Sequence, residues 1–124
     1  MTITEAITRL DSLKPNGYSQ TDKIGWLSIV DGMIKNNIIN THEGGEEVTF
    51  NGYYDDDTPP DTELIVKAPY DELYISWLSS KVDFHNGEFT RYNNNIIRYN
   101  DTLTAYANHY NRTHMPKGKT IKYF

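Results

Sequence analysis

Apolar side chains recur every three or four residues at the start of the chain, which is the spacing of an amphipathic helix. Thr2 and Glu5 stand just before and within this pattern at the spacing of a capping box, in which each side chain satisfies a free backbone amide of the first turn. Pro15 closes the segment. The pattern predicts a helix over about residues 3–13.

A second and broader apolar face follows, which predicts a helix over about residues 20–38. The face is made by Trp26, Ile29, Val30, Met33, Ile34 and Ile38. Gly25 and Gly32 lie inside this helix, where each costs up to about 1 kcal/mol relative to alanine. We expect close helix–helix packing to explain both glycines.

The pattern changes between residues 40 and 69. Residues 47–52 and 62–68 each read as a short strand bounded by glycine or proline. The residues between them include Pro59 and Pro60, which exclude both a helix and a central strand. We therefore expect a two-stranded β arm over about residues 46–68 with an acidic tip.

From Pro69 onward, apolar positions alternate in steps of three and four without interruption. They are Ile75, Leu78, Val82, Phe89, Tyr92, Ile96, Tyr99, Leu103, Tyr106 and Tyr110, with His85 as one polar member. The phase continues across Asn86 and Gly87, which favours one long helix over about 69–112. At 1.5 Å per residue such a helix would be roughly 60 Å long.

The second half of this helix has an apolar face rich in tyrosine, chiefly Tyr99, Tyr106 and Tyr110. Tyrosine combines apolar area with a hydroxyl that tolerates water, which suits a partly wet contact between subunits. An intramolecular bundle lined by tyrosines explains the pattern equally well. With the aromatic residues of the arm, the candidate subunit-interface residues are Tyr99, Tyr106, Tyr110, Phe50, Tyr53 and Tyr54.

Residues 115–124 form an expected extended tail, because Pro116 and Gly118 interrupt regular structure. The tail is basic and aromatic, and a short strand of this kind can dock on another protein. Its candidate partner-docking residues are Lys117, Lys119, Ile121, Lys122, Tyr123 and Phe124. A frayed terminus is the alternative.

Together these segments predict a single domain over residues 1–124: a mainly α helical bundle with one long C-terminal helix, an inserted two-stranded β arm and an extended tail. The 124 residues suffice for a modest core, and the absence of cysteine excludes a disulfide framework. The net charge of −5 argues against binding of duplex DNA by the whole surface. Acidic residues crowd the middle of the chain and basic ones its end, which indicates either electrostatic orientation of neighbours or two solvated segments.

Catalytic and cofactor motifs are missing from the sequence. There is no phosphate-binding glycine loop, no nucleophile elbow and no dinucleotide fingerprint. His42 with Glu43, Glu46 and Glu47 could bind a metal adventitiously, and we expect no genuine metal site there; Asp55 to Asp57 lack the ligand spacing of a calcium loop, and we expect a solvated tip. We predict no catalytic residue, no metal site and no cofactor, and no stretch is apolar enough to cross a membrane.

Several blocks of the sequence resemble a known group of proteins. They are TITEAITRLDSLKPNGYSQTDKIGWLSIVDGMI, THEGGEE, APYDELYISWL, NGEFTRYNN and YNRTHMPKG, which together extend over nearly the whole chain. The group consists of small phage and prophage proteins of Gram-positive bacteria that look like head–tail connector (adaptor) proteins. These blocks are characteristic of the group but are not motifs with a known chemical role. The resemblance therefore identifies no binding residue in this chain.

The resemblance implies a structural virion protein of the phage neck. Such an adaptor is expected to form a ring, of about twelve copies, beneath the portal protein and to extend the DNA channel toward tail or neck proteins. It also implies that the tail segment docks on the portal and that the arm contacts neighbouring or tail proteins. DNA would pass through without specific binding.

Two alternatives stay open at this point. One is another head- or tail-completion protein of the particle. The other is a non-structural, DNA-associated phage protein that uses its basic end, for which salt-dependent DNA binding is the discriminating measurement.

Overall fold

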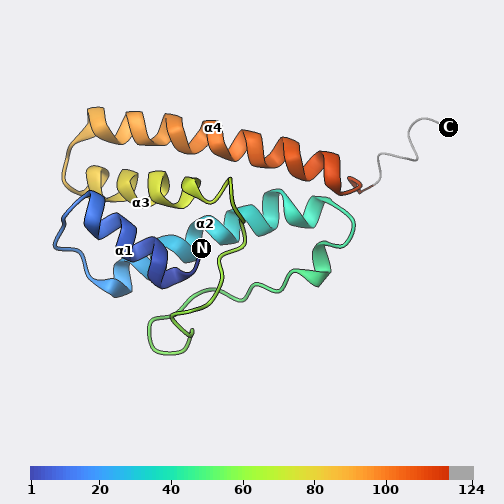
Figure 1. Ribbon diagram of the computed structural model, residues 1–124, viewed down its shortest axis with the longest axis horizontal. Helices are drawn as coiled ribbons and strands as arrows, with labels where there is room; N and C mark the ends of the chain where they lie inside the picture. The colour runs from blue at the N-terminus through green and yellow to red at the C-terminus, as the bar shows by residue number, and fades with distance from the viewer. Residues whose placement is uncertain (118–124) are drawn as a thin grey trace.

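The computed structural model describes residues 1–117 and shows a mainly α-helical chain (Figure 1). Its α-helices are α1 (Ile3–Leu13), α2 (Gln20–Asn37), α3 (Glu72–His85) and α4 (Phe89–Thr113). Two short 3₁₀ helices, η1 (Ile39–Thr41) and η2 (Gly45–Glu47), follow α2. The predictions of a mainly α fold, of the first two helices and of a long C-terminal helix are confirmed at this level.

Side-chain caps fix the starts of α1 and α2. The Thr2 side chain accepts a hydrogen bond from the Glu5 amide, and the Glu5 carboxylate accepts one from the Thr2 amide, which completes the predicted capping box. At α2 the hydroxyl of Ser19 accepts from the Asp22 amide. These caps explain why both helices begin where the sequence pattern places them.

The single helix expected over 69–112 is wrong, because the chain turns back between α3 and α4. Gly87 has φ 75°, a left-handed conformation that glycine adopts at little cost, and Asn86 and Gly87 donate backbone hydrogen bonds to carbonyls of the last turn of α3. The two helices run antiparallel, and α3 lies beside the first part of the longer α4 (Figure 1). The regular phase of the apolar positions persists because each helix presents its apolar face to the other.

The β arm expected over 46–68 is also wrong, since the chain between 48 and 71 has no strand. Only an isolated bridge between Thr2 and Glu63 occurs there. Backbone amides that a partner strand would have satisfied donate to side chains instead: Tyr53 to the hydroxyl of Ser28, Ile65 to Asp31 and Val66 to Tyr74. This segment, here named the α2–α3 loop (residues 48–71), lies on the side of the helices away from α4 in Figure 1.

The core forms where the inner faces of the helices and the α2–α3 loop meet. Its fully buried side chains include Leu10, Leu27, Val30, Ile34, Leu64, Val66, Leu73, Tyr74, Leu78 and Val82. The buried Asp83 of α3 ties three helices at one end, because its carboxylate accepts hydrogen bonds from Lys14 after α1 and from Asn95 of α4. Within residues 1–117, every buried side-chain nitrogen or oxygen has a hydrogen-bond partner.

Candidate functional site

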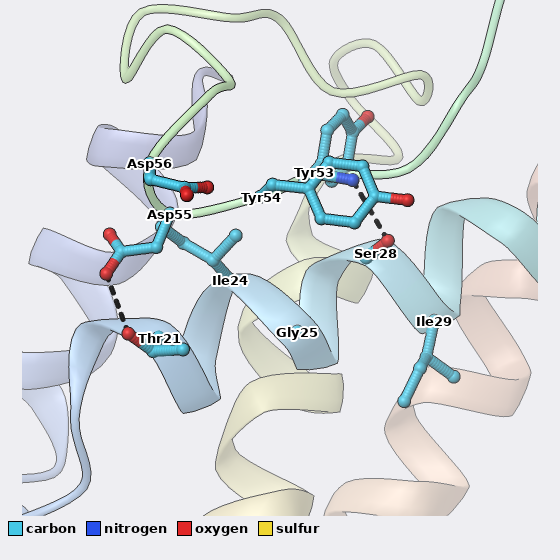
Figure 2. A pocket seen from close by; sticks show the side chains of 9 residues that line it. All are labelled: Thr21, Ile24, Gly25, Ser28, Ile29, Tyr53, Tyr54, Asp55 and Asp56. Carbon is cyan, nitrogen blue, oxygen red and sulfur yellow. Dashed lines mark hydrogen bonds between the residues drawn. The ribbon is translucent and has the colours of Figure 1, made fainter.

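A surface cavity of about 620 Å³ lies between the first half of α2 and the α2–α3 loop. Figure 2 shows α2 beneath it and residues 53–56 of the loop above it. Its lining combines an apolar floor with an acidic wall: Thr21, Ile24, Gly25, Ser28, Ile29, Tyr53, Tyr54, Asp55 and Asp56. This volume falls in the range of pockets that hold small ligands or several side chains of a partner.

The floor of the cavity is the solvent side of α2. Ile29 is 52 % exposed, although it stands in the apolar pattern of the helix. No atom outside the helix lies within 4 Å of the place that a Cβ at Gly25 would occupy, so this glycine leaves open space at the floor. The expectation of close helix packing is therefore wrong for Gly25, and at Gly32 the nearest atom is Phe50 Cε1 at 3.5 Å, an ordinary contact.

The acidic wall is a tight turn of the α2–α3 loop. Tyr54 and Thr58 close it, since the Thr58 amide donates to the Tyr54 carbonyl (2.9 Å) and the Tyr54 amide donates to the Thr58 hydroxyl (2.8 Å). Asp55 accepts a hydrogen bond from the hydroxyl of Thr21 (2.7 Å), which fastens the turn to the start of α2 (Figure 2). The Tyr54 ring is 56 % exposed beside the cavity, and no hydrogen bond of Asp56 is found within residues 1–117.

A buried carboxylate below the cavity holds the loop against α2. Asp31 is fully buried; it accepts hydrogen bonds from the hydroxyls of Tyr53 and Tyr74 (both 2.5 Å) and from the Ile65 amide (3.1 Å). Burial raises the pKa of Asp31 above its ordinary value, and the three donated hydrogen bonds oppose that rise. The tyrosine hydroxyls have raised pKa values for the same reason, first burial and then the neighbouring carboxylate.

The apolar floor continues along α2 toward a second, smaller cavity of about 370 Å³. Met33 stands one turn beyond Ile29 on the same side of α2 and lines this second cavity, which lies between α2 and the middle of α4. Its other lining residues are Ile34, Asn37, Ile38, Trp77, Ile96, Tyr99, Asn100 and Leu103. We call the exposed strip formed by Gly25, Ile29 and Met33, with the cavities at its two ends, the α2 groove.

Most of the predicted subunit-interface residues are buried within the chain itself. Tyr99, Tyr106 and Tyr110 retain 5–7 % of their exposed surface and pack between α4 and the rest of the fold, as the intramolecular alternative expected. Burial raises the pKa of both Tyr99 and Tyr106 to about 12. Tyr53 is buried against Asp31. The buried rings of these four tyrosines therefore no longer argue for a subunit contact, and an interface role for them stays a prediction.

Of the other predicted interface residues, Tyr54 lines the α2 groove, and Phe50 is half-buried, packed edge-on against Tyr53 with ring centroids 5.1 Å apart. Two features that shape this site were not predicted from the sequence. An aspartate between apolar positions of α2, Asp31, was a visible signal of a buried polar contact. The open space above Gly25 could not be predicted from the sequence, in which only the glycine itself is visible.

The start of the predicted tail is fastened beside the end of α2. The Lys117 amide donates to the Thr41 carbonyl (2.9 Å), the Glu43 amide donates to the Met115 carbonyl (2.8 Å), and His42 and Pro116 form a bridge. Among the candidate docking residues, only Lys117 belongs to the part of the chain that the structure describes. Lys119, Ile121, Lys122, Tyr123 and Phe124 lie outside the described residues.

The acidic segment after α2 does not gather metal ligands. His42 is buried, with Nδ1 2.6 Å from the Ile38 carbonyl and Nε2 2.5 Å from Asn111 Oδ1, and its ring packs edge-on against Tyr110. Glu43, in contrast, is exposed. Among residues 1–117, no three His, Asp or Glu side chains are placed to share a metal ion. In the same part of the chain, no helix has both the length and the apolar character that crossing a bilayer requires.

Comparisons with protein-family models, with curated proteins and with solved structures give no match to this chain.

Proposed function

We propose that this protein is a structural component of a phage particle: a head–tail connector that assembles as a ring beneath the portal and extends the DNA channel to the tail. The resemblance of nearly the whole chain to small phage adaptor proteins suggests this role. The single structural observation that supports it is the α2 groove, an exposed apolar surface with an acidic border on a chain whose polar interior is otherwise satisfied. Surfaces of this kind bind other proteins.

The buried polar groups favour a binding protein over an enzyme. Asp31, Asp83 and His42 each join separate segments of the chain, and each is surrounded by hydrogen-bond partners that fix it in place. The carboxylates that do face the larger cavity are Asp55, which is hydrogen-bonded to Thr21, and Asp56, and the described lining holds no histidine, lysine or cysteine to pair with them. The buried residues account for the fold, and the exposed groove remains as the surface available for function.

The charge of the chain agrees with a protein past which DNA moves. A net charge of −5 gives the phosphate backbone little overall attraction, whereas a lysine-rich wall would bind it and slow its passage. The portal, tail or neck proteins and further copies of this chain are the proposed partners. The location that follows is the neck of the virion, after synthesis in the cytoplasm of a bacterial host.

A pull-down with the portal protein of the same phage, followed by negative-stain imaging, tests this function. Full-length protein should form a ring beneath the portal. A second version that ends at Lys119 tests whether the segment from Thr120 to Phe124 is needed. This version should retain its helix content, as measured by circular dichroism, and should no longer bind the portal.

Absence of portal binding by both versions, with helicity intact, would refute the connector role. The chain would then be proposed to be another head- or tail-completion protein of the particle. Salt-dependent DNA binding at micromolar protein would instead favour the non-structural alternative.

A further inference from the structure

We propose that the acidic end of the α2 groove binds the tail segment, residues 117–124, of a second copy of this chain. The contact would join copies head to tail. It places the tail on a neighbouring copy rather than on the portal. The contact needs no portal, so its failure would leave the connector proposal standing, and the reverse also holds.

The chemistry of the groove and of the tail is complementary. The cavity has Asp55 and Asp56 on one side and the apolar floor of α2 on the other (Figure 2). The tail sequence, KGKTIKYF, supplies three lysines together with Ile121, Tyr123 and Phe124. Opposite charges on two surfaces select the partner and its orientation.

The absence of a side chain at Gly25 keeps the floor of the cavity open. Within α2 a glycine is less favourable than an alanine, and the space around Gly25 shows no packing that requires a glycine. A larger side chain there would fill the floor of the cavity between Ile24 and Ile29. An occupant from outside the described residues accounts for the open floor.

Lys122 does not reach the acidic wall of its own chain, which favours a tail from a second copy. Lys117 is held at Thr41, beyond the C-terminal end of α2, whereas Asp55 is bonded to Thr21 at the other end of that helix. The sixteen residue steps from Thr21 to Asn37 extend about 24 Å along the axis of α2. Lys122, five residues after Lys117, reaches at most about 18 Å when fully extended.

A donor at one end of the molecule and an acceptor at the other make a heterologous contact. Repetition of such a contact closes into a ring when the rotation between copies allows it, and otherwise forms an open chain. The Asp83 and Asp31 clusters hold the helices and the loop as one body, so the spacing between donor and acceptor is set by the fold.

Disulfide cross-linking between full-length chains tests the inference directly, because the natural chain has no cysteine. Two single variants, Ile29→Cys and Tyr123→Cys, are mixed at equal concentration under mild oxidation. The expected product is a heterodimer. Leu13→Cys mixed with Tyr123→Cys is the matched control, since Leu13 is even more exposed (66 %) but lies away from the groove.

Charge reversal gives a second and independent measurement. Each exposed ion pair changes affinity by up to about five-fold, so loss of two pairs through Asp55→Lys with Asp56→Lys should weaken the contact about tenfold. Lys119→Glu with Lys122→Glu in the tail partner should restore the yield of heterodimer, because the two charges are then opposite again. Glu46→Lys with Glu47→Lys makes the same change in charge at an exposed site outside the groove and should have little effect. Gly25→Leu should block the contact without altering any charge.

Equal cross-linking of Ile29→Cys and Leu13→Cys, or none with Ile29→Cys at about 100 µM, would overturn the inference. So would a disulfide that forms within one chain carrying both Ile29→Cys and Tyr123→Cys at high dilution, since that result would assign the groove to the chain's own tail. A tail that is needed for portal binding but does not cross-link to Ile29→Cys would give the segment to the portal instead.

Discussion

The buried carboxylate of Asp31 allows one chemical change, tyrosine to phenylalanine, to be compared at two places with different expected costs. Tyr74 donates to Asp31 Oδ1 at 2.5 Å, and its hydroxyl also accepts from the Val66 amide at 2.8 Å. Tyr53 donates to Asp31 Oδ2, which the Ile65 amide also contacts. The substitution removes one oxygen in each case and leaves the ring in place.

The structure predicts a larger loss for Tyr74→Phe. Among the described residues this change leaves two buried groups without a partner, Asp31 Oδ1 and the Val66 amide, and each costs about 1–3 kcal/mol. We expect a loss of about 4 kcal/mol in the free energy of unfolding. Tyr53→Phe removes one hydrogen bond to an oxygen that keeps the Ile65 amide, so we expect about 2 kcal/mol.

Urea denaturation followed by circular dichroism at neutral pH measures both values. Tyr99→Phe is the matched control. Its hydroxyl has no hydrogen bond within residues 1–117 and, since every fully buried polar atom there has a partner, it stays within reach of water, so its removal should change the free energy of unfolding by less than about 0.5 kcal/mol. A Tyr74→Phe variant no less stable than Tyr53→Phe would refute the reasoning. It would mean that water or a rearranged loop satisfies the carboxylate in place of Tyr74.

Three further outcomes follow from the backbone and from the same carboxylate. Gly25→Ala should stabilise the chain by about 0.5–1 kcal/mol, since a Cβ there meets open space within a helix. Gly87→Ala should destabilise it by about 1 kcal/mol, because the φ of Gly87 is 75°. Thermal melts that shifted in the same direction for both variants would contradict this. Gly45→Ala should cost about 2 kcal/mol or more in urea, because its Cβ would lie 2.5 Å from the Ile39 carbonyl oxygen, and a neutral result would mean that the η2 backbone moves freely. The raised pKa of Asp31 means that the folded state holds the proton more tightly than the unfolded state. The stability linked to this group is therefore complete below the ordinary aspartate pKa of about 4, and it is lost as the pH rises through the pKa of Asp31 in the folded state. Urea midpoints of wild type and Asp31→Asn from pH 4 to pH 8 should therefore show the wild type declining relative to the variant, and a wild type that gains instead would show the pKa to be lowered.

The helices whose limits are set locally were predictable from sequence. The capping residues Thr2 and Ser19 mark the starts of α1 and α2, and each apolar face then follows the period of the helix. The turn between α3 and α4 was visible as Asn86-Gly87 but was outweighed by the regular phase of apolar positions. An antiparallel pair can keep that phase, so phase alone does not distinguish one long helix from two.

The α2–α3 loop was not predictable, because its hydrogen bonds go to side chains distant in sequence. The amides of Ile65 and Val66 look available for a strand ladder, yet Asp31 and Tyr74 accept from them. The acidic wall of the α2 groove depends on the same contacts. Composition predicted an acidic turn at residues 55–57, but not that it would lie over the exposed face of α2.

The order of synthesis places a constraint on how the Asp31 cluster forms. All three donors to Asp31 come later in the chain, at Tyr53, Ile65 and Tyr74. While the chain grows on a ribosome, α1 and α2 are complete long before Tyr74 has left the exit tunnel, and until then burial of the α2 face would leave a charge without its partners. We therefore expect α1 and α2 to stay unpacked until α3 emerges, and the fold to close late and in one cooperative step rather than helix by helix.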